Sequence, residues 1–113
     1  MRRQAIWVAA LVAVAAPGPA GAATLAELAG WCGPGGEPGN DRLCGAYLET
    51  IFKGLASKDP VMNGGNRMCV PEDADRAEII RLVRAYAAKA PAPDKISALD
   101  GVGAALKGRY PCR

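Results

Sequence analysis

The chain of 113 residues has 14 Lys and Arg residues against 11 Asp and Glu residues, and it has no histidine. The absence of histidine removes the commonest general base, the usual metal ligand and the triads built on imidazole. No run of Lys or Arg indicates a nucleic acid or an anionic membrane as a partner.

Residues 1–23 have the layout of a secretory signal peptide. A basic start precedes an apolar run over residues 5–16, and small residues follow at 20–22. The run of about 12 residues is too short for a membrane-spanning helix, which needs roughly 20. We therefore expect export to the periplasm, cleavage after Ala22 or Ala23, and no membrane contact afterwards.

Residues 24–113 are expected to form a single small domain. Loss of Arg2 and Arg3 with the signal peptide leaves 12 Lys and Arg residues against 11 acidic ones, a net charge near +1. An even number of cysteines in a small exported domain indicates disulfide bonds. Their spacings of 12, 25 and 43 residues do not fit a zinc site, whose ligands usually pair roughly two to four residues apart. The four cysteines are Cys32, Cys44, Cys69 and Cys112.

A short helix is predicted over residues 24–32. Thr24 can cap this helix and Glu27 completes a capping box, and the apolar residues that follow share one face at helical spacing. The glycine- and proline-rich stretch 33–41 then predicts a loop.

A longer helix is predicted over residues 41–59, with Asn40 or Asp41 as its N-cap. Gly45 and Gly54 each cost about 1 kcal/mol relative to Ala inside a helix, so we expect a neighbouring helix to approach closely there. The apolar stripe predicted to face the core consists of Leu43, Cys44, Tyr47, Leu48, Ile51, Phe52 and Leu55.

The segment 61–67 shows no evident structural role in the sequence. Its Asn-Gly-Gly-Asn centre predicts a turn or a mobile loop, which is often slack and sometimes a recognition element. The stretch 33–40 is a second candidate for recognition. The first candidate, a partner-binding loop, consists of Asn63, Gly64, Gly65, Asn66 and Arg67.

Two further helices are predicted over residues 75–90 and 94–110, separated by prolines that cannot continue a helix. Asp75 and Glu78 form a second capping box at the start of the first. The residues expected to face inward are Ile79, Leu82, Val83 and Tyr86 in the first helix and Ile96, Leu99, Gly103, Leu106 and Tyr110 in the second.

Four helices with short connections predict an all-α fold, a small four-helix, disulfide-stapled, up-and-down array. Cys32 and Cys44 then lie at one end of the array, and Cys69 and Cys112 lie at the other. This placement predicts the pairs Cys32–Cys44 and Cys69–Cys112. The chain-entropy model gives them roughly 3 and 4 kcal/mol of stabilisation.

The sequence predicts no catalytic residue, no metal site and no cofactor. Cysteines in disulfide bonds leave no thiolate nucleophile. The acidic residues of the stretch 72–78 lie at a predicted helix N-terminus, where negative charge is favoured. No phosphate-binding glycine motif is present. A binding protein is therefore expected rather than an enzyme.

The order of several short motifs resembles the Rap/Tai family of periplasmic immunity proteins. The motifs are Cys-Gly-Ala-Tyr at 44–47 followed by Gly54, Cys-Val-Pro at 69–71, a helix that ends near Pro91, and the closing Tyr-Pro-Cys at 110–112. The resemblance implies a small helical protein, often dimeric, that binds a peptidoglycan amidase toxin delivered by type VI secretion and blocks its active site. A homodimer is left open.

Two other functions fit the same pattern. Small, helical, disulfide-bonded architecture is also that of the HdeA-type periplasmic acid-stress chaperones, so an HdeA-like chaperone is one alternative. A structural envelope protein of unknown partner is another. A small hydrolase is disfavoured because the usual catalytic groups are missing.

Overall fold

The computed structural model describes residues 23–33 and 38–113. Residues 1–22 of the predicted signal peptide and residues 34–37 of the glycine-rich loop lie outside the described residues. The described part is helical, and the all-α class is confirmed. It contains α2 (Leu25–Trp31), α3 (Pro38–Ala56), α4 (Pro60–Asn63), α5 (Arg76–Lys89), the 3-10 turn η3 (Pro93–Lys95) and α6 (Ala98–Ala105).

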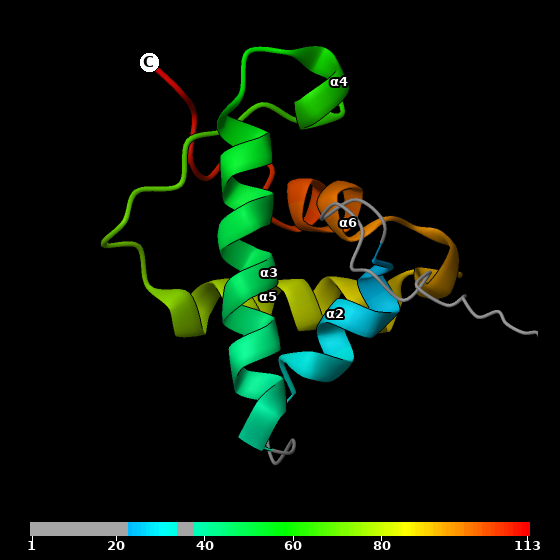
Figure 1. Cartoon of the computed structure of the whole chain (residues 1–113). Coiled ribbons are helices and arrows are strands. Elements are labelled where there is room, and N and C mark those ends of the chain that lie inside the picture. Colours follow the sequence, from blue (N-terminus) through cyan, green and yellow to red (C-terminus); the bar gives the residue numbers. More distant parts are fainter. Residues whose placement is uncertain (1–22, 34–37) are drawn as a thin grey trace, which may run out of the picture.

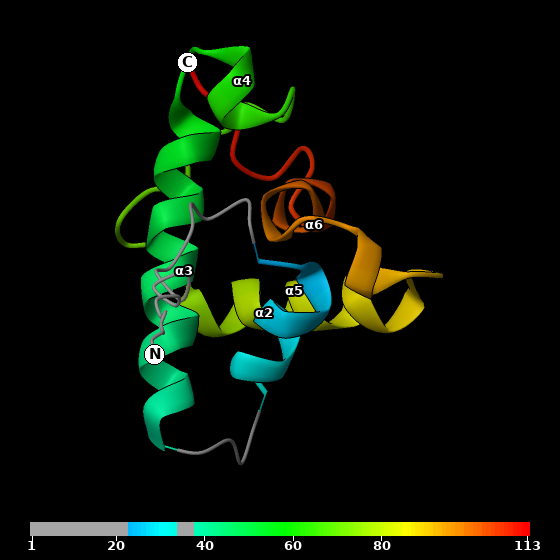
Figure 2. The same cartoon turned by 45° about the vertical axis from the view of Figure 1, so that its right-hand side comes forward.

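The helices are crossed rather than laid side by side. α3 and α5 run at a steep angle to each other in both views, and α2 and α6 lie together on one side of α3 (Figures 1 and 2). The predicted up-and-down row is therefore not the observed arrangement: the 14-residue α5 crosses the 19-residue α3, and the short α2 and α6 pack against each other.

One apolar core joins α2, α3, α5 and α6. Many of its residues come from the predicted faces, but the buried Val102 and Met68 were not predicted, and two residues predicted to face inward are exposed. Leu43 is 40% exposed, because it lies in the first turns of α3, which extend past the level of α5 (Figure 1). Tyr86 is 36% exposed, because the buried face of α5 is formed by Ile79, Val83 and Ala87, at steps of four residues, and Tyr86 lies next to that face. The largest fully buried side chains are Leu25, Leu28, Leu48, Ile51, Leu55, Ile79, Val83, Val102 and Leu106.

The start of α2 is fixed by the predicted capping box. The Thr24 amide donates to Glu27 Oε1 at 2.9 Å, and the Glu27 amide donates to Thr24 Oγ1 at 3.1 Å. Two otherwise unpaired amides at the helix N-terminus are thereby satisfied.

The last helix begins later than predicted, at Ala98, because the preceding residues pair with the start of α2. Thr24 and Ser97 form an isolated antiparallel bridge. Ser97 also caps α6, since its Oγ accepts from the Asp100 amide at 3.1 Å. The sequence of residues 94–97 does not predict this pairing, because the partner segment lies about 70 residues earlier in the chain.

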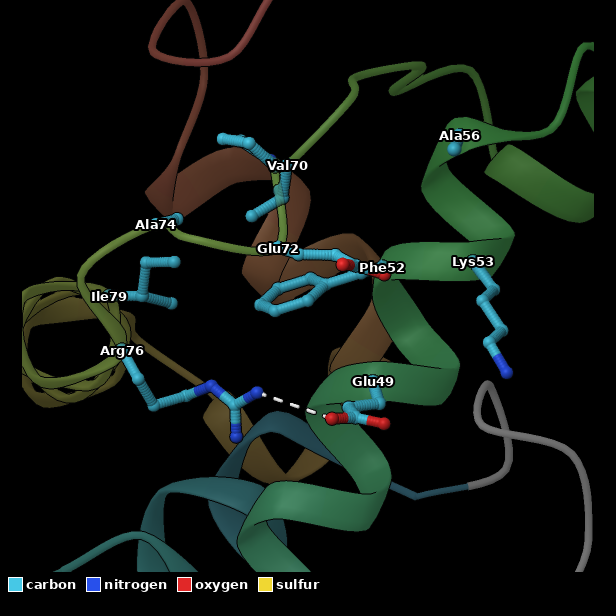
Figure 3. A pocket seen from close by; sticks show the side chains of 10 residues that line it. Glu49, Phe52, Lys53, Ala56, Val70, Glu72, Ala74, Arg76 and Ile79 are labelled. Carbon is cyan, nitrogen blue, oxygen red and sulfur yellow. Dashed lines mark hydrogen bonds and ion pairs between the residues drawn. The ribbon is translucent and has the colours of Figure 1, made fainter.

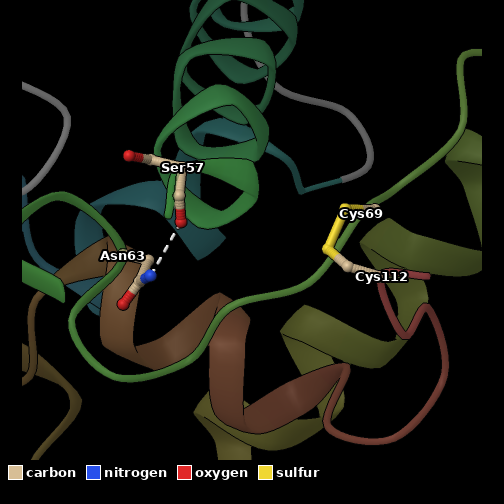
Figure 4. Close-up of a disulfide and its surroundings, with 4 residues drawn as sticks. All are labelled: Ser57, Asn63, Cys69 and Cys112. Atoms are coloured by element: carbon tan, nitrogen blue, oxygen red, sulfur yellow. Dashed lines mark hydrogen bonds between the residues drawn. A yellow bond between two sulfur atoms is a disulfide. The ribbon is translucent and has the colours of Figure 1, made fainter. Parts of the chain in front are cut away.

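Two disulfide bonds join the predicted pairs. Cys32, the C-cap of α2, bonds to Cys44 in α3. Cys69 bonds to Cys112 near the C-terminus, and its amide donates to the Tyr110 carbonyl at 2.8 Å (Figure 4). The C-terminal residues are thereby tied to the segment that follows α4.

Candidate functional site

The segment predicted to be a turn or a mobile loop is a turn built around α4. Asp59 caps this helix, because its Oδ1 accepts from the Val61 amide at 2.9 Å. Pro60 occupies the first helical position, where a missing N–H costs nothing. Gly64 ends the helix at φ 63°, a left-handed conformation that favours glycine.

Asn63 has a structural role that the sequence did not indicate. It is 4% exposed. Its Nδ2 donates to the Ser57 carbonyl at 2.8 Å (Figure 4), and its Oδ1 accepts from the Gly65 amide at 2.7 Å. The side chain therefore satisfies two backbone groups inside the turn, and it does not point toward a partner.

Asn66 is held against α6. Its Nδ2 donates to Asp100 Oδ1 at 3.4 Å and to the Gly64 carbonyl at 3.2 Å. A Cβ atom at Gly103 would lie 2.7 Å from Asn66 Cβ, so glycine is required for this close approach. Two of the five residues in the candidate loop therefore stabilise the turn.

Two exposed side chains of this region are large and apolar. Val61 is 86% exposed and Met62 is 54% exposed. We refer to Val61, Met62 and the adjoining exposed Gly64, Gly65 and Arg67 as the α4 tip. It lies at the C-terminal end of α3, beyond α6, in both views (Figures 1 and 2).

The exposure of Val61 and Met62 could have been predicted from the sequence. Both lie between Pro60, which can start a helix, and the Asn-Gly pair at 63–64, which can end one, and a helix this short cannot bury both side chains. The prediction instead selected the Asn and Gly residues of 63–66 as the binding loop. The side chains of two of them, Asn63 and Asn66, stabilise the turn.

Gly54 confirms the expected close approach to α3. A Cβ atom there would lie 3.3 Å from the Met62 carbonyl oxygen and 3.4 Å from Leu99 Cδ1, so α4 and α6 both approach at this point. At Gly45 only the tip of the Arg76 side chain lies nearby, at 3.5 Å. The predicted helix contact is thus formed at one glycine of the two.

A shallow hollow of about 380 Å³ lies between α3 and the segment 70–76 (Figure 3). Phe52 and Val70 supply apolar surface, and Arg76 Nη2 and Glu49 Oε2, 3.5 Å apart, form an ion pair at its side. The lining contains no cysteine and no histidine, and its ionisable side chains are Glu49, Lys53, Glu72 and Arg76.

Glu78 lies at the centre of a small group of surface ion pairs. Glu78 bonds to Arg81 at 2.7 Å and lies 3.9 Å from Arg109. The side-chain hydrogen bond from Glu78 and its negative charge raise the pKa of Arg81 above its usual value, so this arginine stays charged. The predicted capping box of Asp75 and Glu78 is only half formed. Asp75 accepts a hydrogen bond from the Glu78 amide at 3.2 Å, but the Glu78 side chain pairs with Arg81 and Arg109 instead of bonding back to the Asp75 amide.

Two negative findings apply to the described residues. They contain no group of three or more His, Cys, Asp or Glu side chains placed to hold a metal ion. None of their helices is long and apolar enough to cross a membrane.

Fold and site together define a small, disulfide-bonded helical protein with an exposed apolar turn. The family model of the Rap1a immunity proteins matches residues 24–112. The chain belongs to this family, which confirms the resemblance found in its motifs. Comparisons with curated proteins and with solved structures gave no match. Membership suggests an immunity protein against a type VI effector, an inhibitor rather than an enzyme.

Proposed function

We propose that this protein resides in the periplasm, binds a peptidoglycan amidase toxin delivered by type VI secretion, and blocks it stoichiometrically. The observation that carries the proposal is the family match over residues 24–112. The signal-peptide layout of residues 1–23 supports the periplasmic location, where the substrate of such a toxin lies.

The α4 tip is the proposed contact surface. Val61 and Met62 are exposed apolar side chains on a turn whose backbone groups are already satisfied. A preordered turn loses little conformational entropy on binding, and buried apolar anchors supply most of the energy of typical interfaces. Of the candidate residues 63–67, Gly64, Gly65 and Arg67 are exposed and remain available to contact the toxin at the edge of this surface.

Growth of a toxin-producing strain tests the function. A secreted amidase encoded beside this chain is directed to the periplasm, with and without this protein. We expect lysis without it, rescue with it, and a purified complex with equal numbers of the two chains. The measured mass of the free protein also reports whether it is a homodimer.

Unchanged lysis together with the absence of any complex would contradict the proposal. Protection of unrelated client proteins at low pH, without toxin binding, would favour the acid-stress chaperone instead.

A further inference from the structure

Leu99 of α6 lies where the end of α4 meets α3. A Cβ atom at Gly54, in α3, would lie 3.4 Å from Leu99 Cδ1. A Cβ atom at Gly64, which ends α4, would lie 3.2 Å from Leu99 Cδ2. The two methyl groups of one side chain therefore approach glycine backbone on two sides, and Leu99 fills the junction of α3, α6 and the α4 turn.

Several hydrogen bonds of the α4 turn are internal to it. Asp59 caps α4 through its side chain. The Gly64 amide donates to the Pro60 carbonyl at 2.9 Å. Asn63 Oδ1 accepts from the Gly65 amide at 2.7 Å. These bonds fix the shape of the turn, but they do not fix its position against α6.

The polar contact between this turn and α6 is weak. Asn66 Nδ2 donates to Asp100 Oδ1 at 3.4 Å, and the bond is exposed. A hydrogen bond of this length contributes little. Asn66 also packs on Gly103, but that contact holds the chain after the turn and not the end of α4. The apolar contact of Leu99 with Gly64 is thus the one that holds the end of α4 on α6.

We propose that Leu99 is a positioning residue for the α4 tip, which it holds in one orientation so that Val61 and Met62 face a partner together. Shortening Leu99 leaves the turn formed but free to move against α6. A mobile tip loses more conformational entropy when it binds, so the affinity for a partner falls. The effect on toxin binding rests on the proposed function, whereas the effect on the position of the tip does not.

The backbone mobility of residues 61–65 gives the first test. Nitrogen-15 relaxation is measured on the wild type, Leu99→Ala and Leu99→Met. We expect order parameters of about 0.85 in the wild type and below about 0.6 in Leu99→Ala. Leu99→Met keeps the volume of the side chain and should restore the wild-type values. Unchanged order in Leu99→Ala overturns the proposal.

Val83→Ala is the matched control for a general loss of packing. Val83 is 1% exposed in the core face of α5, and α5 lies away from α4 in both views (Figures 1 and 2). The substitution removes buried methyl groups without touching the junction at Leu99. The tip should keep its wild-type order parameters. Equal loosening of the tip by Val83→Ala and Leu99→Ala also overturns the proposal.

Titration of the neighbouring amidase with the same four proteins gives the second test. We expect Leu99→Ala to bind at least about tenfold more weakly, and Leu99→Met and Val83→Ala to bind within about threefold of the wild type. A loosened tip with wild-type affinity overturns the role of Leu99 in binding. If the wild type itself does not bind the amidase, the proposed function fails, and the relaxation measurement still decides whether Leu99 positions the tip.

Discussion

At the scale of single residues, Gly101 in α6 is required because a neighbouring side chain packs against it, and not because the backbone turns there. A Cβ atom at Gly101 would lie 2.6 Å from Leu25 Cδ1, inside a fully buried part of the core. We expect Gly101→Ala to lower the free energy of unfolding by about 1–3 kcal/mol, the usual cost of overpacking. Urea denaturation measures this change.

Gly30→Ala is the matched control for that substitution. Gly30 is also helical, but a Cβ atom there would meet nothing within 4 Å. The change should be neutral or stabilising, by up to about 1 kcal/mol, since alanine is the better helix former. Equal destabilisation by both variants would show that the contact with Leu25 is unimportant.

Asn63 should matter for stability more than for binding. Asn63→Ala leaves the Ser57 carbonyl and the Gly65 amide without their partner, and we expect a loss of about 1–3 kcal/mol in urea denaturation. Asn66→Ala should cost less, because its bond to Asp100 is long, at 3.4 Å, and exposed. A larger loss at Asn66 would contradict this ranking.

The two methionines of the folded domain differ in their exposure to oxidants. Met62 is 54% exposed and Met68 is 5% exposed. We expect dilute hydrogen peroxide to convert Met62 to its sulfoxide at least about tenfold faster than Met68, because a buried sulfur is shielded from the oxidant. Peptide mass spectrometry over time measures both rates, and equal rates would show that the α4 tip is covered in solution.

At the scale of elements, the two disulfide bonds should contribute unequally. The Cys69–Cys112 bond closes 43 residues and the Cys32–Cys44 bond closes 12. The chain-entropy model gives roughly 4 and 3 kcal/mol for loops of these lengths. Replacing each pair by serine should therefore destabilise the protein more at 69 and 112, as measured by urea denaturation. The reverse order would show that local packing, not loop length, decides the contributions.

The helices were largely predictable because their signals are local. Apolar periodicity located α2, α3 and α5, and the Thr24–Glu27 capping box marked the start of α2 within one residue. The cysteine pairs were predicted from the two ends of an up-and-down array, and the same pairs form although the helices are crossed. The shortening of α6 was not predictable, because Ser97 caps the helix only after residues 23–25 pair beside it.

The candidate site was only partly predictable. Composition directed attention to the turn at 63–67, but it could not separate the residues that build the turn from those that it exposes. Asn63 is buried only because Ser57 and Gly65 offer it backbone partners. Val61 and Met62 are exposed only because α4 is one turn long and projects past α6.

At the scale of the whole molecule, the crossed helices and the two disulfide bonds form a scaffold, and the α4 tip is its most exposed apolar part. The chain has no histidine, and its four cysteines form two disulfide bonds. Inhibition by occlusion is the function proposed for this surface, on the basis of family membership.

Titration of the neighbouring amidase with three forms of this protein tests the role of the α4 tip most directly. The forms are the wild type, the double variant Val61→Asp/Met62→Asp, and Leu43→Asp, which changes an exposed apolar residue at the other end of α3. We predict that the double variant binds at least about 30-fold more weakly, equivalent to about 2 kcal/mol, with an unchanged melting temperature. Leu43→Asp should bind within about threefold of the wild type. Wild-type affinity in the double variant would contradict occlusion by the α4 tip.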